Sequence, residues 1–211
     1  MRGLKSAITF IVIGVLGIIL LVISIKDKVE LAKPPANIEY MTEDDFYSGR
    51  FVEGYVYEIW NEYASLQESD TIFGISYNTK TTAHYFAMPL ETSFYTNQPK
   101  FVALSVRDSS DYRTAQRMEQ ESLDYYNYDD AELETTMYIK GKITKLTGDG
   151  KKYFDEYMED EGFIPSDVSV HYVINVGNDG KGSTTALLIG IGVTVVGLFG
   201  TVICILRGRA R

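Results

Sequence analysis

The sequence predicts an α+β domain between two transmembrane helices, and three observations support this fold class. Uncharged apolar segments occupy residues 7–25 and 185–206, near the two ends of the chain. The residues between them combine stretches in which apolar side chains alternate, as in strands, with stretches in which they recur every three or four positions, as in helices. This middle part, residues 26–184, holds every acidic residue and no cysteine.

The two apolar segments are long enough to cross a bilayer. At a rise of about 1.5 Å per residue they span roughly 28 and 33 Å, against a hydrocarbon core of about 30 Å. We therefore expect the lipid bilayer as a partner, with residues 26–184 on one side of it. The first segment has the basic start of a signal peptide, but a cut after Ala32 would place Glu30 where a small residue is needed. We expect an uncleaved anchor.

Basic residues beside the apolar segments predict the orientation. Five flank them: Arg2 and Lys5 before the first segment, and Arg207, Arg209 and Arg211 after the second. Because positive flanks resist translocation, residues 1–6 and 207–211 are expected in the cytoplasm and the middle domain outside it. The domain has no Asn-x-Ser/Thr sequence, which favours a bacterial cell membrane over a glycosylated eukaryotic surface.

Small residues follow one face of the second apolar segment. Spaced by three or four positions, they are Ala186, Gly190, Thr194, Gly197, Thr201 and Cys204. Such a face lets another helix backbone come close. The two segments are therefore expected to pack together, or the second to pack on a partner or on another copy. The simpler alternative is that Gly and Ala are common in membrane helices generally.

The charge of the middle domain excludes several functions. It carries 15 basic and 29 acidic residues, a formal charge of −14. Nucleic-acid binding needs a basic face, so we expect no such partner, and binding to anionic lipid is disfavoured for the same reason. Without cysteine, the domain must be stabilised by an apolar core and not by disulfides.

Similar segments recur at an offset of 87 residues. Residues 51–59 resemble residues 138–146, each with an aromatic start, a central Gly and β-branched neighbours. The same offset relates the His-Tyr pairs at 84–85 and 171–172, and the acidic stretches at 42–45 and 129–132. This pattern predicts an internal duplication of a strand, a variable connection and a second strand. The two units would cover about residues 40–90 and 127–177.

Each element follows from a local pattern. The central Gly54 and Gly141 predict a bulge or a close backbone approach in their strands. Further elements are expected as a short helix or loop at 61–68, a strand at 100–106, and amphipathic helices at 110–126 and 150–161. The second helix has Tyr153, Phe154, Tyr157 and Met158 on one face, and the first has Tyr112, Ala115, Met118, Leu123 and Tyr126 on its inner side. About five strands result, and a five-stranded OB-like barrel is the alternative fold.

No catalytic constellation is present in the sequence. There is no Gly-x-Ser-x-Gly, no Ser-x-x-Lys, no phosphate-binding glycine loop and no thiol outside the second apolar segment. We therefore expect a non-enzymatic protein without catalytic residues, cofactor or metal. His84 and His171 could hold a metal if the repeat brought them together, and the acids between 124 and 134 could bind calcium, but neither has a recognised ligand spacing.

Three short motifs carry a resemblance to a known type of protein: Val52-Glu-Gly-Tyr-Val56, His84-Tyr-Phe86 and Ile139-Lys-Gly-Lys-Ile143. In layout the chain resembles an uncharacterised family of small two-pass bacterial membrane proteins with a Tyr-rich extracytoplasmic domain. The resemblance implies that layout along the whole chain. It implies no activity and no site residues.

Two functions remain after these exclusions. The first is a non-enzymatic scaffold that binds another membrane or envelope protein, or a second copy, through its acidic, Tyr-rich surface and the small-residue face at 186–201. The alternative is a sensor or module that binds a small ligand or calcium at the membrane surface. An unrecognised hydrolase is a third hypothesis that no motif supports.

Overall fold

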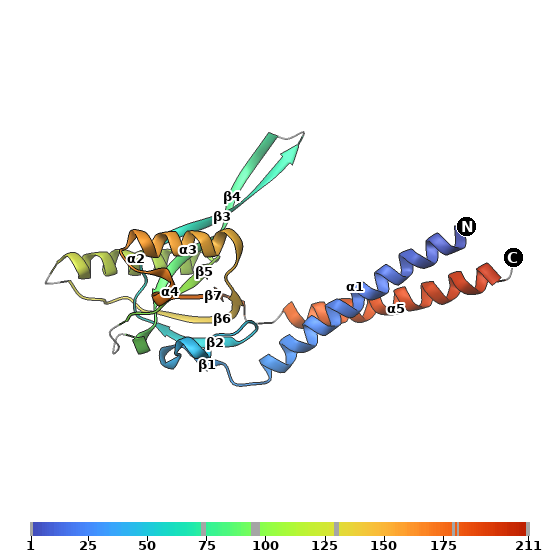
Figure 1. Ribbon diagram of the computed structural model, residues 1–211, viewed down its shortest axis with the longest axis horizontal. Helices are drawn as coiled ribbons and strands as arrows, with labels where there is room; N and C mark the ends of the chain where they lie inside the picture. Colours follow the sequence, from blue (N-terminus) through green and yellow to red (C-terminus); the bar gives the residue numbers. More distant parts are fainter. Residues whose placement is uncertain are drawn as a thin grey trace. The chain divides into compact units, whose positions relative to one another are not determined.

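The protein is described here from a computed structural model, which covers residues 2–72, 75–93, 98–128, 131–178, 180 and 182–209. The chain forms two compact units. One unit consists of Met1–Pro34 and Gly180–Arg211, and the other of Pro35–Asp179. The first is a pair of helices, and the second is an α+β domain built on a mixed sheet (Figure 1). The predicted α+β class is confirmed.

The domain contains a single seven-stranded sheet within the described part of the chain. Its strands are β1 (Ala36–Asn37), β2 (Phe51–Val56), β3 (Glu62–Ile72), β4 (Ile75–Pro89), β5 (Phe101–Val106), β6 (Met137–Lys145) and β7 (Ser169–Val176). Their spatial order is β1-β2-β6-β7-β5-β4-β3, with β1–β2 and β5–β7 parallel and the other pairs antiparallel. The sheet is open, with β1 and β3 at its edges. The OB-like barrel is therefore wrong, because a barrel pairs its first and last strands.

Helices cover both faces of the sheet. They are α2 (Ser109–Asn127), α3 (Gly148–Asp160) and the short α4 (Pro165–Val168), with 3-10 turns η1 (Ile38–Tyr40), η2 (Glu43–Asp45) and η3 (Glu91–Ser93). Phe86 of β4 packs in one core cluster with Ala115 of α2, whereas the next residue, Ala87, packs in another with Phe154 of α3. Because successive strand residues point to opposite faces, α2 and α3 lie on opposite sides of the sheet.

The inner face of α2 differs from the prediction in its last turns. Ala115 and Met118 are buried as expected, but Leu123 and Tyr126 are 40% and 56% exposed, and Ser122 is the inward residue at 2%. On α3, Phe154 and Met158 are buried whereas Tyr153 is exposed. The spacing of apolar residues along a helix therefore does not by itself identify which side chains are buried. Burial also depends on the tertiary contacts that each part of the helix makes.

Residues 62–68, which make up nearly all of the short helix or loop expected at 61–68, form a strand. They belong to β3, which pairs antiparallel with β4 in a long hairpin. Strand β4 contacts β5 only from His84 to Pro89, so the rest of the hairpin is a two-stranded ribbon (Figure 1). Local propensity in residues 62–72 is weak, and their conformation is set by pairing with β4.

The structure does not support the internal duplication. The two similar strands, β2 and β6, are antiparallel neighbours. However, β6 also pairs with β7, its expected second strand, whereas β2 does not pair with β4. The connections differ as well, since β3 lies between β2 and β4 while α3 lies between β6 and β7. Two copies of one unit would share their internal pairing.

The central glycines of β2 and β6 have different physical roles. Gly54 has φ 141°, and a Cβ on it would lie 2.4 Å from Oδ1 of Asn37. Gly141 does not have a positive φ, but a Cβ added to it would lie 2.7 Å from the carbonyl oxygen of Asn175 in β7. The expected close backbone approach is confirmed at Gly141, whereas at Gly54 the near atoms belong to the side chains of Asn37 and Ile38.

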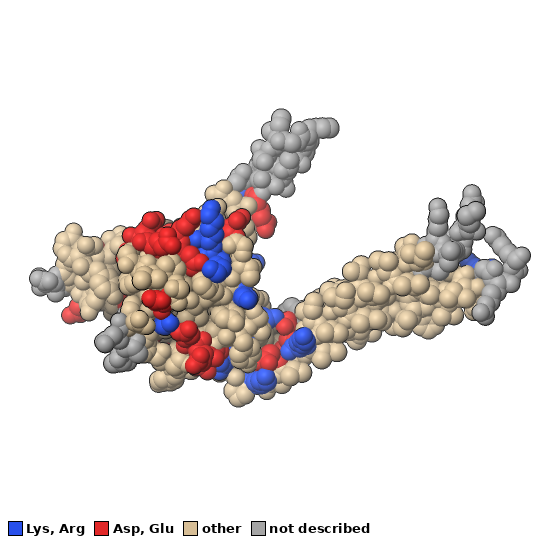
Figure 2. Space-filling model, viewed as in Figure 1, with Lys and Arg blue, Asp and Glu red and all other residues tan. Residues whose placement is uncertain are grey.

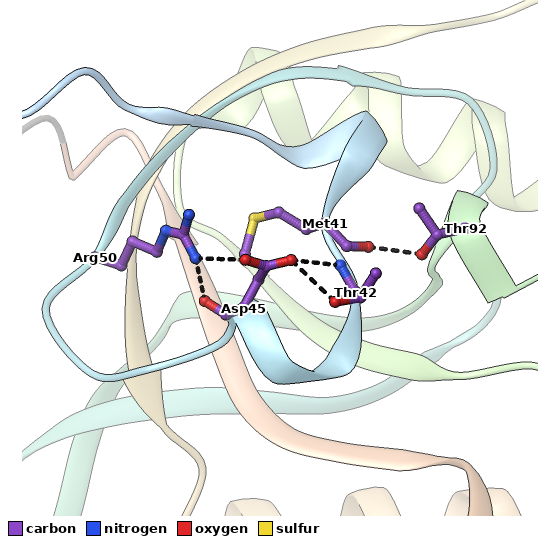
Figure 3. A network of polar contacts seen from close by, with 5 residues as sticks. All are labelled: Met41, Thr42, Asp45, Arg50 and Thr92. Carbon is purple, nitrogen blue, oxygen red and sulfur yellow. Dashed lines mark hydrogen bonds and ion pairs between the residues drawn. The ribbon is translucent and has the colours of Figure 1, made fainter.

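A polar network fixes the segment between β1 and β2 (Figure 3). The Asp45 carboxylate accepts hydrogen bonds from the backbone N–H and the hydroxyl of Thr42, both at 3.0 Å, and from Nη1 of Arg50 at 3.1 Å. The bonds from Thr42, followed by that from Arg50, lower the pKa of Asp45. The Thr92 hydroxyl donates to the carbonyl of Met41 at 2.7 Å. The acidic stretch at 42–45 is thus a capped turn with a structural role.

The other unit pairs helix α1 (Arg2–Leu31) with helix α5 (Gly182–Arg209). Both are long and apolar enough to cross a membrane, at Ile8–Leu31 and Thr185–Arg207. The exposed surface of both is composed of uncharged residues over most of its length, whereas acidic and basic side chains gather on the α+β domain (Figure 2).

The small residues of α5 lie where it contacts α1. A Cβ on Gly197 would lie 2.4 Å from Cα of Gly14, and one on Gly190 would lie 3.2 Å from the Leu21 side chain. Thr194 lies against Gly17. The hydroxyls of Thr194 and Thr201 donate at 2.7 Å to the carbonyls of Gly190 and Gly197 within α5 itself. Ala186 is half-buried on the same helix.

We predict that Gly197→Leu destabilises the helix pair by about 1–3 kcal/mol, the usual cost of forcing a larger side chain into a packed contact. Gly192→Leu is the matched control, because no atom lies within 4 Å of a Cβ at that position. The measurement is resistance of the full-length protein to unfolding by SDS in mixed micelles. Equal midpoints for the two variants would contradict a close contact at Gly197.

Candidate ligand-binding site

A cavity of about 260 Å³ opens at the start of β3, where α2 and α3 come near each other from the two faces of the sheet. The described residues that line it are Trp60, Asn61, Glu119, Ser122, Leu123, Tyr126, Asn127, Tyr157 and Glu161. Aromatic rings and carboxylates dominate this lining. None of these residues is a lysine, arginine or histidine.

Trp60 is fixed at the sheet edge by both backbone and side-chain contacts. Its backbone N–H donates to the carbonyl of Ala87 in β4 at 2.8 Å. Its ring lies 4.6 Å from that of Phe101 and 6.0 Å from that of Phe163, centroid to centroid. The indole therefore joins the core on the α3 side of the sheet while it also lines the cavity.

A buried carboxylate holds two of the aromatic side chains of the cavity. Glu58 is 7% exposed, and its Oε1 accepts hydrogen bonds from Nε1 of Trp60 at 2.5 Å and from the hydroxyl of Tyr126 at 2.8 Å. The two rings lie 5.6 Å apart with their planes at 72°. Burial, followed by the hydrogen bond to Glu58, raises the pKa of Tyr126. Glu58 thus fixes an aromatic corner, since a buried carboxylate strongly requires its donors.

Glu119 is the partly buried acid of the lining. Its Oε1 accepts the backbone N–H of Glu62 at 2.9 Å. Burial, followed by the charge of Glu62, raises the pKa of Glu119 above its ordinary value of 4.5. Because its pKa is raised, Glu119 binds its proton more tightly in the folded protein than in the unfolded chain. The stability of the folded protein therefore falls as the pH rises from 4.5 through the raised pKa. A cation beside Glu119 would offset this loss of stability.

Two further observations concern Ser122 and Tyr157. The Ser122 hydroxyl is buried and has no hydrogen-bond partner among the described residues. Burial, followed by the charge of Glu161, raises the pKa of Tyr157. An unsatisfied hydroxyl is costly in a packed interior. A ligand in the cavity with a hydrogen-bonding group would relieve it.

The half of α2 that lines the cavity is clamped at Glu121. Its carboxylate accepts the backbone N–H groups of Glu134 and Thr135 at 3.1 and 2.7 Å, and the Thr135 hydroxyl at 2.6 Å. It also pairs with Arg117 at 3.0 Å. Burial alone would raise the pKa of Glu121, but the bonds from Thr135 and Arg117 lower it. This clamp ties α2 to the segment that enters β6.

The two histidines lie apart and have separate partners. His84 stands opposite Val106, at the end of β5, and its Nδ1 lies 2.8 Å from Oε1 of Glu62. It also stacks on Tyr112, with ring centroids 3.6 Å apart. His171 belongs to β7, beyond β5, and its Nε2 lies 2.7 Å from Oδ1 of Asp155. The histidines do not form the shared metal site that a repeat would have produced.

The acidic stretch considered for calcium falls partly outside the described residues, since Asp129 and Asp130 are not among them. Of its other members, Asp124 accepts a hydrogen bond from Gln120, and Asn127 donates to the carbonyl of Leu123. Within the described ranges, no group of three or more His, Cys, Asp or Glu side chains could hold a metal ion.

Sequence reasoning missed the cavity. Its lining residues come from three separate segments, at 60–61, 119–127 and 157–161, and Glu58 holds two of them from behind the lining. One signal was available, because Trp60 is the only tryptophan of the chain and lies two residues after Glu58. Only the fold shows that Tyr126 of α2 completes the contact with Glu58.

The fold and the cavity define a class of protein: an α+β domain with an aromatic and acidic cavity, in one chain with two membrane-length helices. The chain belongs to the family described as Domain of unknown function (DUF8577), whose model matches residues 1–207. The expectation of an uncharacterised family that spans the whole chain is thereby confirmed. No curated protein matches the sequence.

Removal of the Glu58 carboxylate tests the aromatic corner. We predict that Glu58→Ala shifts the fluorescence of Trp60 to longer wavelength and lowers the free energy of unfolding by about 2 kcal/mol, because two donors lose a charged acceptor. Glu91→Ala is the control. Burial, followed by the charge of Glu58, raises the pKa of Glu91, so Glu91 experiences the same charge without bonding to either ring. Unchanged emission in Glu58→Ala would contradict this role.

Proposed function

We propose that this protein is a non-enzymatic binding protein, anchored in a membrane by α1 and α5, whose α+β domain takes up a small ligand in the Trp60 cavity. The observation that carries the proposal is the cavity itself. Its aromatic corner is fixed by Glu58, and it also contains the unpartnered Ser122 hydroxyl. A concave site with rigid rings and a few polar groups is the usual form of a small-molecule site.

Membrane anchoring is supported by the length and surface of the two helices. Large apolar side chains such as Ile11, Leu16, Leu188 and Phe199 are exposed on them. In water such a surface would be strongly unfavourable, whereas in lipid it is the expected one. The small residues lie between the helices and leave the larger side chains outside.

We also propose that both termini are cytoplasmic and that the domain is extracytoplasmic, in a bacterial cell membrane. The basic residues at 2, 5, 207, 209 and 211 support this orientation. Replacing Cys204 by Ser and exposed Ser109 by Cys gives a single labelling position in the domain. A membrane-impermeant maleimide should label this variant in intact cells, and a cysteine at position 2 only after lysis. Labelling at position 2 in intact cells, and at position 109 only after lysis, would indicate the opposite topology.

Native mass spectrometry of the full-length protein, extracted in mild detergent from its own membranes, tests ligand binding. A bound small mass is expected on the unmodified protein. Leu123→Trp should remove it, because Leu123 lines the cavity and its exposed side chain leaves room for a larger ring on the rim. Tyr125→Trp is the control, since Tyr125 is exposed nearby but does not line the cavity. A bound mass that both variants retain would place the ligand elsewhere.

A scaffold that binds a partner protein is the second candidate, and one surface favours it. Tyr55 and Tyr138 are exposed on the neighbouring strands β2 and β6, with their rings 5.1 Å apart, and Tyr57 is exposed just after β2. Exposed tyrosines are typical of protein interfaces. The small-residue face of α5 gives this candidate no support, because that face contacts α1. The same native spectra would show a defined oligomer or a bound protein.

A further inference from the structure

We propose that the ligand of the Trp60 cavity is a small organic ammonium ion that also carries a hydroxyl group, as choline does. This inference rests on the proposed function, since it requires that the cavity binds a ligand, and it names the chemical class. Three properties of the lining lead to it: the aromatic corner, the uncompensated carboxylates and the free hydroxyl of Ser122.

The aromatic corner is suited to a cation. Trp60 and Tyr126 pack edge to face with their planes at 72°, and Tyr157 supplies a third ring in the lining. The faces of such rings attract cations, with Trp the most effective, and cages of aromatic side chains are the usual sites of quaternary ammonium groups. Because Glu58 holds the Trp60 and Tyr126 side chains in place, the corner exists before the ligand arrives, which lowers the entropic cost of binding.

The charges of the lining point to the same class. Glu119 and Glu161 line the cavity, and neither forms an ion pair within the described part of the chain. An anionic ligand would be repelled by both carboxylates. A neutral ligand would leave the partly buried Glu119, which among the described residues accepts only the Glu62 N–H, without an opposite charge, whereas a cation would supply one. The domain as a whole, with its formal charge of −14, would also attract cations.

Size and hydrogen bonding narrow the class further. At about 260 Å³ the cavity lies just below the range of roughly 300–1,000 Å³ for drug-sized ligands, which fits a small ion. Ser122 lines the cavity, and its buried hydroxyl, which has no partner among the described residues, can exchange a hydrogen bond with a ligand hydroxyl. A methylated ammonium group against the rings and a hydroxyl at Ser122 would use both ends of the site.

The single tryptophan provides a direct test on the full-length protein in a maltoside detergent. Fluorescence of Trp60 is recorded during titration with choline and, separately, with 3,3-dimethylbutan-1-ol, which has the same shape and hydroxyl but no charge. We expect a saturable change with choline at an apparent Kd at least tenfold lower than that of the neutral isostere. Trimethylacetate, the anionic analogue, should produce no saturable change.

Matched variants localise the effect. Glu119→Gln keeps an acceptor for the Glu62 N–H and removes only the charge, and it should weaken choline binding about tenfold while affinity for the neutral isostere is unchanged. Glu159→Gln, an exposed acid of α3 outside the cavity lining, removes the same charge from the domain. It should retain the affinity of the unmodified protein. Equal weakening in both variants would overturn a local role for Glu119.

The outcomes separate this inference from the proposed function. Equal affinity for choline and its neutral isostere would overturn the ammonium class and leave a ligand-binding cavity. No response to either, together with another small mass that Leu123→Trp removes in native spectra, would also overturn the ammonium class alone. No response and no bound mass would overturn both the class and the binding function. Charge-dependent, saturable binding that Glu119→Gln weakens supports the proposal.

Discussion

The burial of one carboxylate organises the part of this domain that contains the cavity. Glu58 follows β2 and lies in the interior, where an ionised acid must be compensated by donors. Its donors are the Trp60 indole and the Tyr126 hydroxyl, so the loop after β2 and the end of α2 are brought together. A hydrophobic residue at position 58 could fill the space, but it could not fix the angle between two rings.

Close contacts between backbone segments depend on glycine residues. Gly54, Gly141, Gly17 and Gly197 all stand where another chain segment occupies the space of a Cβ. In the sheet these contacts set the spacing of β1, β2, β6 and β7. In the helix pair they let two backbones approach where larger side chains would hold them apart. The glycines therefore have a steric role, and at Gly54 the positive φ adds a conformational one.

Local patterns predicted those elements whose burial is decided by their own sequence. The strand-like segment at 138–146, the strand at 100–106 and the amphipathic helices at 110–126 and 150–161 appear, with slightly shifted ends, as β6, β5, α2 and α3. The predictions failed where pairing with a segment distant in sequence determined the structure. Residues 62–72 became a strand because β4 offered a partner, and the similar segments at 51–59 and 138–146 contain two paired neighbouring strands and not two copies of one unit.

By itself, the sequence determined the α+β class, the two membrane-length apolar helices, the acidic character of the middle domain and the need for an apolar core without disulfides. These properties depend on composition and on periodicity over short distances. Only the tertiary structure decided the open sheet, the α1–α5 contact and the cavity of Trp60, Glu119, Ser122 and Tyr126. The physical reason is that a cavity is formed by side chains from segments far apart in sequence, and no short-range pattern records which of them meet.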